Sequence, residues 1–132
     1  MWFGQNWPEY NGLLFEINNN PKNKAHGVYR KSMGMKKNVS DLILVEPKQG
    51  HTIGIELKAP GSKHSSEHIK NQIDWGKQLI NNGGYYIMTS DLSTLKEFIS
   101  DIIKGDYLSA MEIQYSQLIF VGKQLGVKTI KF

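Results

Sequence analysis

Two acidic residues and a lysine in the middle of the chain have the types and the spacing that phosphodiester hydrolysis needs. Asp41 leads an apolar run, and Glu56 and Lys58 lie two residues apart in the alternating stretch that follows. Hydrolysis requires that a water lose a proton and that the phosphate be relieved of charge, and a divalent cation held by carboxylate oxygens does both. A lysine in the same space can orient the water or stabilise developing charge. We therefore expect these three residues to share one site.

The segments that carry these residues are predicted to be two paired strands. The run 41–45 is continuously apolar after its leading acid, as is typical of a buried central strand. The stretch 52–58 alternates apolar and other residues, and Glu56 and Lys58 fall in the same phase. Because successive side chains of a strand point to opposite faces, we expect Glu56 and Lys58 on one face. A turn over 47–50 would join the two strands as a hairpin.

The next segments predict a βαβ unit followed by a helix. Ser65 or Ser66 can cap a helix that reaches Asn81, where an Asn-Gly-Gly sequence ends it. Residues 85–89 read as a third strand, which makes the helix a right-handed crossover. Asp91 then caps an amphipathic helix.

The two ends of the chain give weaker signals. Residues 13–17 read as a short strand, and the basic stretch 21–34 reads as a loop. In the segment 106–132 we expect a helix or strand around 113–121 and a final strand over 127–132.

Length and composition suit one α/β domain over residues 1–132, with three layers and a mixed central sheet flanked by helices. The chain is 39% hydrophobic and 21% charged, as in ordinary globular proteins. It has no cysteine, which excludes disulfides and thiolate metal sites and fits a reducing compartment. No apolar stretch is long enough to cross a bilayer, and the first residues lack the pattern of a signal peptide. We expect a cytoplasmic protein.

The order and spacing of these motifs resemble the virus-type replication-repair nuclease (VRR-NUC) domains of the PD-(D/E)XK superfamily. The Glu-x-Lys string alone is weak, because an exposed ion pair would give the same string. The wider match covers residues 13–99, with 106–132 as a C-terminal extension. It departs from the family where Ser40 replaces a proline and Asn38 a glycine. The residues that carry the resemblance are Asp41-Leu42, Glu56-Leu57-Lys58, Gln72-Ile73-Asp74-Trp75, Leu79, Gly83 and Tyr86-Ile87-Met88.

The resemblance implies a restriction-endonuclease-like fold and a role for each residue of the motif. Asp41 and Glu56, helped by the carbonyl of Leu57, would bind Mg²⁺ or Mn²⁺. Lys58 would position the attacking water, and Gln72 would contact this lysine or the scissile phosphate.

The function implied is that of a metal-dependent DNA endonuclease, selective for structure in the manner of a Holliday-junction resolvase. Relatives that stand alone are small, are often found in phages and tend to act as homodimers on branched or duplex DNA, here in the cytosol of a bacterial host. Many members carry a further acid near the N-terminus, and Glu9 and Glu16 are the upstream acids in this chain. The alternative is a catalytically inactive nucleic-acid-binding module, or a phage inhibitor or adaptor, on the same fold.

Basic residues are concentrated between Glu16 and Asp41, where either the enzyme or the inactive module could contact DNA. The net charge is +4, and no acid occurs between Glu16 and Asp41. A polyanion or simply solvent could face this stretch. Only one of the sixteen basic residues is arginine, which favours recognition of the DNA backbone or shape over base reading. The candidate DNA contacts are Lys22, Lys24, Arg30, Lys31, Lys36 and Lys37, with Lys63 and Lys70 beside the predicted active site.

Other residues of chemical interest have competing interpretations. His64 and His68 have the spacing of zinc ligands, but no third ligand is evident, and His51 has no partner that the sequence reveals. The aromatic residues within 2–10 could bury themselves against a partner chain. Three tyrosines could stack on bases, although tyrosines near strands more often belong to the core, namely Tyr85, Tyr86 and Tyr107.

Overall fold

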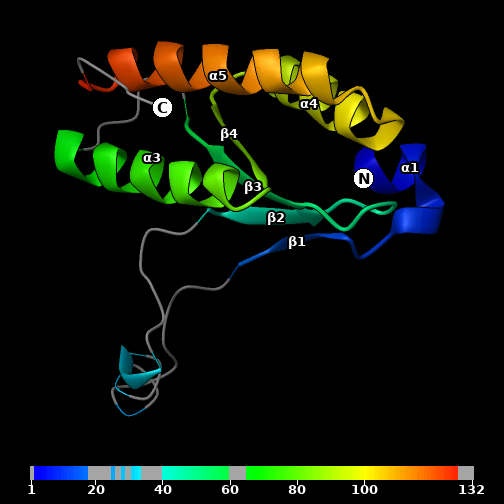
Figure 1. Cartoon of the computed structure of the whole chain (residues 1–132), viewed down its shortest axis with the longest axis horizontal. Helices are drawn as coiled ribbons and strands as arrows, with labels where there is room; N and C mark the ends of the chain where they lie inside the picture. Colours follow the sequence, from blue (N-terminus) through cyan, green and yellow to red (C-terminus); the bar gives the residue numbers. More distant parts are fainter. Residues whose placement is uncertain are drawn as a thin grey trace.

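A computed structural model describes residues 2–17, 25, 28, 31–33, 40–59 and 65–127. In this part of the chain, helices lie on both faces of a four-stranded mixed sheet, so the protein is of the mixed α/β class (Figure 1). None of the described helices combines the length and the apolar character that crossing a membrane requires. The elements are α1 (Trp2–Asn6), the 3-10 helix η1 (Pro8–Tyr10), β1 (Leu14–Glu16), β2 (Leu42–Val45), β3 (Thr52–Leu57), α3 (Ser66–Asn81), β4 (Tyr85–Thr89), α4 (Leu92–Lys104) and α5 (Tyr107–Gln124).

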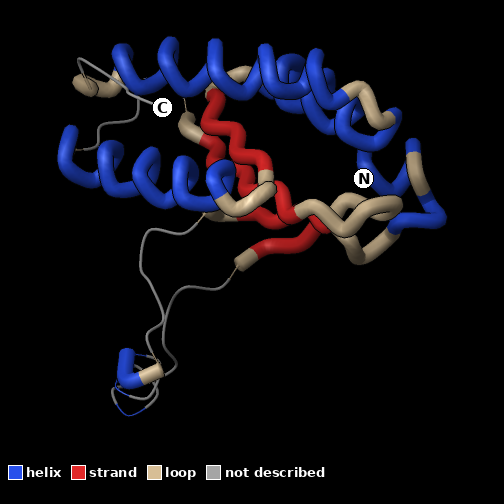
Figure 2. The backbone as a smooth tube through the Cα atoms, viewed as in Figure 1, coloured by secondary structure: helices blue, strands red, loops and turns tan. Residues whose placement is uncertain are grey.

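The sheet has the order β1-β2-β3-β4 (Figure 2). β1, β2 and β3 are antiparallel neighbours, and β4 runs parallel to β3 because α3 carries the chain back between them. In the β2–β3 hairpin Leu42 faces Ile55, and Gly50 takes the positive φ of 73° that the turn requires. The strands predicted over 13–17, 41–45, 52–58 and 85–89, the hairpin and the βαβ unit are therefore confirmed, as are the helix caps at Ser65 and Asp91.

The strand alternation divides the core between the two faces of the sheet. On one face, Ile53, Ile55 and Ile87 pack against the apolar side of α4 and against Phe3 of α1. On the other face, α3 and α5 pack against alternate residues of β4, beginning with Tyr86. α3 approaches closely here, since a Cβ at Gly76 would lie only 2.3 Å from the Tyr86 ring. This is the face to which Glu56 points.

α5 covers the edge of the sheet that β4 would otherwise expose. An edge strand presents unpaired backbone groups, which folded proteins pair or cover. The side-chain oxygen of Gln114 accepts a hydrogen bond of 2.7 Å from the backbone N–H of Tyr86. The Thr89 hydroxyl donates to Gln117 Oε1 over 2.8 Å. Two glutamines of α5 thus bind this edge strand at both ends.

The structure corrects the predictions for the two ends and the basic stretch. The expected helix or strand around 113–121 is part of α5, and Val127 is not in a strand, while 128–132 lie outside the described residues. In the stretch predicted to be a loop, the described positions 25, 28, 31 and 32 are helical. The aromatic N-terminus forms α1 and η1 and packs against the protein's own core, so these rings contact the domain itself.

Candidate active site

The strand register brings Asp41 and Glu56 together. Leu42 is the partner of Ile55, so the next position on each strand places Asp41 beside Glu56 on the opposite face of the sheet. The backbone N–H of Asp41 donates to Glu56 Oε2 over 3.2 Å. The two acids that lie fifteen residues apart in the sequence are therefore neighbours at one end of the hairpin.

Lys58 and Gln72 complete a chain of polar contacts around the Glu56 carboxylate. Gln72 Nε2 donates to Glu56 Oε1 over 2.8 Å, and Lys58 Nζ donates to Gln72 Oε1 over 2.6 Å. Lys58 Nζ also lies 3.3 Å from Glu56 Oε1. The predicted helix over 66–81 supplies Gln72, and the strand alternation supplies the other two side chains. The amide thus bridges the carboxylate and the ammonium group.

These side chains differ sharply in their exposure to solvent. Glu56 is 2% exposed, and Lys58 and Gln72 are each 5% exposed, whereas Asp41 is exposed. Charged residues are almost never this buried unless they are paired. Among the described residues, Lys58 provides the positive charge beside the two carboxylates. When both carboxylates are ionised, Asp41, Glu56 and Lys58 together carry a net negative charge. Asp41 is the member of this group that is exposed to solvent.

This excess of negative charge affects the pKa of Glu56. Burial and the neighbouring Asp41 carboxylate raise the pKa of Glu56 to about 7, although Lys58 acts in the opposite direction. A bound cation would replace the proton by supplying the missing positive charge.

The donor set fits a hard divalent cation. Mg²⁺ is commonly bound by one or two carboxylates and completes its shell with water and substrate phosphate. Asp41 and Glu56 supply the carboxylates. The N–H of Lys58 donates to Thr89 O of β4, and in a planar trans peptide the Leu57 carbonyl must point the other way, toward β2 and Asp41. All three groups named from the resemblance are thus directed toward the same place.

No third acid joins this pair in the described part of the chain. Glu16 pairs with Leu42 across β1 and β2, so its side chain lies on the face opposite to Glu56. Glu9 is exposed in η1. Among the described residues, no group of three or more His, Cys, Asp or Glu side chains is placed to bind a metal ion. The described part of the chain therefore offers two carboxylates at this place.

The predicted DNA contacts fall in both described and undescribed parts of the chain. Lys31 and Lys70 are exposed, and Lys70 lies on α3 two residues before Gln72. His64, the first residue of the histidine pair, lies outside the described residues, and the zinc hypothesis remains a prediction. Six of the eight predicted contacts lie outside the described residues as well: Lys22, Lys24, Arg30, Lys36, Lys37 and Lys63.

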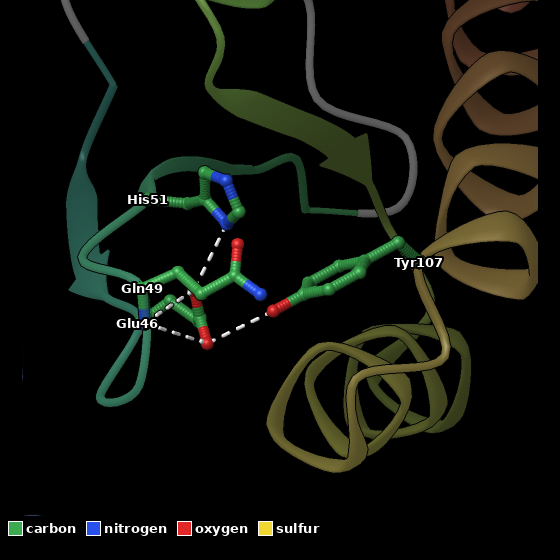
Figure 3. Close-up of polar contacts among 4 residues, drawn as sticks. All are labelled: Glu46, Gln49, His51 and Tyr107. Carbon is green, nitrogen blue, oxygen red and sulfur yellow. Dashed lines mark hydrogen bonds and ion pairs between the residues drawn. The ribbon is translucent and has the colours of Figure 1, made fainter.

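A second buried carboxylate, which the sequence did not reveal, lies at the other end of the hairpin (Figure 3). Glu46 is 1% exposed. Its Oε2 accepts a hydrogen bond of 3.0 Å from the Tyr107 hydroxyl, its Oε1 lies 2.9 Å from His51 Nδ1, and both oxygens lie 3.3 Å from the backbone N of Gln49. Tyr85 stacks on Tyr107, with ring centroids 5.8 Å apart. The only sequence signal was an acid at the end of an apolar strand, just before a turn.

The environment of Glu46 favours its charged form. Burial by itself would raise the pKa of the Glu46 carboxyl, but the hydrogen bonds from Tyr107 and the hairpin backbone and the charge of His51 outweigh it. The pKa of Glu46 therefore lies below its ordinary value. This cluster fastens the start of α5 to the β2–β3 turn.

Comparisons of the chain with family models, with curated proteins and with solved structures find no match.

Proposed function

We propose that this protein is a metal-dependent DNA endonuclease of the PD-(D/E)XK type, with a restriction-endonuclease-like domain. One observation carries the proposal, namely the convergence of Asp41, Glu56, Lys58 and Gln72 on one face of the sheet. Buried charged groups with a raised carboxyl pKa are typical of functional sites, and a purely structural ion pair would have matched its charges. The VRR-NUC resemblance supplies the same four residues in the same order.

Each residue has a role that follows from its contacts. Asp41 and Glu56, with the Leu57 carbonyl, would hold Mg²⁺ or Mn²⁺, which when bound lowers the pKa of a water and offsets phosphate charge. Lys58 is held by Gln72 and faces the same space as both acids, so its ammonium group can orient the attacking water. Gln72 keeps the lysine and Glu56 at fixed separation, and its helix excludes solvent from behind the site.

The proposed substrate is DNA, with branched structures such as four-way junctions preferred. Lys31 and Lys70 are exposed and available to phosphates, and the chain as a whole is basic. A four-way junction presents two strands of similar geometry, which a two-fold homodimer can cut symmetrically. We propose the bacterial or phage-infected cytosol as the place of action.

Cleavage of end-labelled four-way-junction, duplex and single-stranded DNA with Mg²⁺ or Mn²⁺ tests this function. Wild type is compared with Glu56→Ala and Lys58→Ala, and Glu16→Gln serves as the matched control. Glu16 is also an acid of this sheet, but it lies on the opposite face. We expect metal-dependent cutting that both alanine variants lose and the control keeps.

The other outcomes separate the alternatives. DNA binding without cutting of any substrate would favour an inactive nucleic-acid-binding module. Failure to bind any nucleic acid at low salt would favour an inhibitor or adaptor. Loss of cutting in the Glu16→Gln control would mean that the metal site has been assigned to the wrong acidic residues.

A further inference from the structure

The outer face of α5 exposes three large apolar side chains among polar and charged ones. The inner side of α5 buries Ala110, Leu118 and Val121 against the rest of the protein. Its outer side leaves Leu108 77%, Phe120 56% and Ile119 40% exposed.

α4 shows that this is a property of α5 and not of surface helices in this fold. Both helices pack their inner sides against the same core, and Figure 1 shows α5 along the upper margin of the molecule. Past its first residue, however, the exposed positions of α4 are polar or charged, as at Ser93, Glu97 and Lys104. Several large exposed apolar side chains on one helix make this face of α5 the candidate contact surface for a partner.

The charges on the outer face of α5 indicate what that partner is. Glu112, Ser116, Ile119 and Lys123 are all exposed, and their spacing of four, three and four residues forms one straight seam along the helix. In an antiparallel pair of identical helices related by a two-fold axis midway along this seam, Glu112 faces Lys123 of the partner. The small Ser116 faces the larger Ile119, and Phe120 flanks the centre of the contact. The seam is thus complementary to itself.

We infer that the outer face of α5 binds a second copy of this chain in an antiparallel α5–α5 pair. Each interface then contains two Glu112–Lys123 ion pairs around an apolar centre, which is the isologous pattern that two-fold symmetry requires. Nothing in this inference depends on catalysis. The contact is small, and we expect a dimer that forms reversibly in the micromolar range or above.

Exchange of the two charges tests the inference, read out by sedimentation velocity up to high-micromolar concentration. Glu112→Lys or Lys123→Glu alone places like charges together, and we expect each to weaken dimerisation by about tenfold or more. The double variant, Glu112→Lys with Lys123→Glu, should dimerise like wild type. Rescue cannot arise within one chain, because eleven residues separate these side chains by about 16 Å along a helix.

Controls keep the test independent of folding. Glu97→Lys makes the same charge change on the exposed side of α4 and should leave the dimer intact. Circular dichroism should show equal helix content in all variants. A wild-type protein that remains monomeric, or a dimer indifferent to the charge exchange, would overturn the inference. A monomer that dimerises only after deletion of 128–132 would also overturn it, and would assign this face to the protein's own C-terminal residues.

Discussion

Glu46 and Glu56 are two carboxylates of the same hairpin that solvent barely reaches, but Glu56 lies deeper in the protein and the groups around the two differ. Glu46 is 1% exposed and Glu56 is 2% exposed. Hydrogen bonds from Tyr107 and the hairpin backbone and the charge of His51 outweigh the effect of burial on Glu46, and its pKa is lowered. Burial and Asp41 act together on Glu56, and its pKa is raised to about 7. Burial alone therefore does not decide what a carboxylate does.

The difference between the two sites lies in how completely each charge is compensated. At Glu46, the Tyr107 hydroxyl and the backbone N–H of Gln49 donate hydrogen bonds, and no second acid among the described residues competes for them, so the ionised carboxylate contributes to stability. At Glu56, a second acid competes with one lysine, so the folded protein holds an ionised carboxylate that it stabilises poorly. A cation would complete the second site and has no place in the first. This contrast is the physical basis of the proposed function.

The largest expected effect comes from removing the ammonium group of Lys58, which pairs with Glu56. Lys58→Met keeps the length of the side chain, and we expect DNA cleavage to fall by about 10²–10³-fold, as when one preorganised donor is removed from an active site. Because Lys58 lowers the pKa of Glu56, the variant should also bind Mn²⁺ only at higher pH. Initial rates on a labelled four-way junction measure the first effect. Lys104→Met, at the exposed end of α4, is the control, and equal losses in both variants would remove Lys58 from the mechanism.

The two glutamates should respond oppositely to the same substitution. Glu46→Gln removes charge-assisted hydrogen bonds, and we expect it to lower the free energy of unfolding by about 2 kcal/mol near pH 8. Glu56→Gln removes a poorly stabilised charge, so its free energy of unfolding near pH 8 should equal or exceed that of wild type. Urea titration without metal measures both. Equal destabilisation by the two substitutions would contradict the claim that the protein stabilises the charge of Glu46 but not that of Glu56.

The pH dependence should show the same contrast. The raised pKa of Glu56 gives a stability contribution that is present below pH 4.5 and lost as the pH rises through about 7. The lowered pKa of Glu46 gives one that is present above pH 4.5 and lost as the pH falls below that value. As the pH rises from 4 to 8, the free energy of unfolding of wild type should therefore increase relative to that of Glu46→Gln. Over the same range it should decrease relative to that of Glu56→Gln. A wild-type advantage over Glu56→Gln that grew toward pH 8 would reverse the sign assigned to Glu56.

The smallest expected effect concerns a single neutral donor in the Glu46 cluster. Tyr107→Phe removes one hydrogen bond to the carboxylate while keeping the ring that stacks on Tyr85. We expect the free energy of unfolding to fall by about 1 kcal/mol, with cleavage unchanged. Thermal unfolding and the junction assay measure the two quantities. A loss of cleavage in this variant would show that the two ends of the hairpin are coupled.

The sequence predicted the central part of the fold because each element there carries a local signal. Alternation defined β3, a capping serine and an apolar stripe defined α3, and Asp91 marked the start of α4. α5 gave only an undecided prediction over 113–121 because apolar residues such as Ile119 and Phe120 on its exposed side weaken the helical periodicity.

The candidate site was predictable for the same reason, and the Glu46 cluster was not. Glu56 and Lys58 share a strand, so alternation placed them on one face. Gln72 was assigned to the site by the family resemblance, and the predicted helix over 66–81 carries it. Glu46 meets Tyr107 across 61 residues of sequence. Only the packing of α5 against the hairpin creates that contact, and no local pattern records it. The contact of Gln114 with Tyr86 of β4, across 28 residues of sequence, was missed for the same reason.

Calorimetric titration of Mn²⁺ into wild type, Glu56→Gln and Glu46→Gln near pH 8 tests the central claim most directly. The account predicts one binding event in wild type, its retention in Glu46→Gln and its loss in Glu56→Gln. The affinity in wild type should rise about tenfold per pH unit below pH 7, because the cation displaces the Glu56 proton. No binding by wild type, or equal binding by Glu56→Gln, would contradict the assignment of Glu56 as a metal ligand.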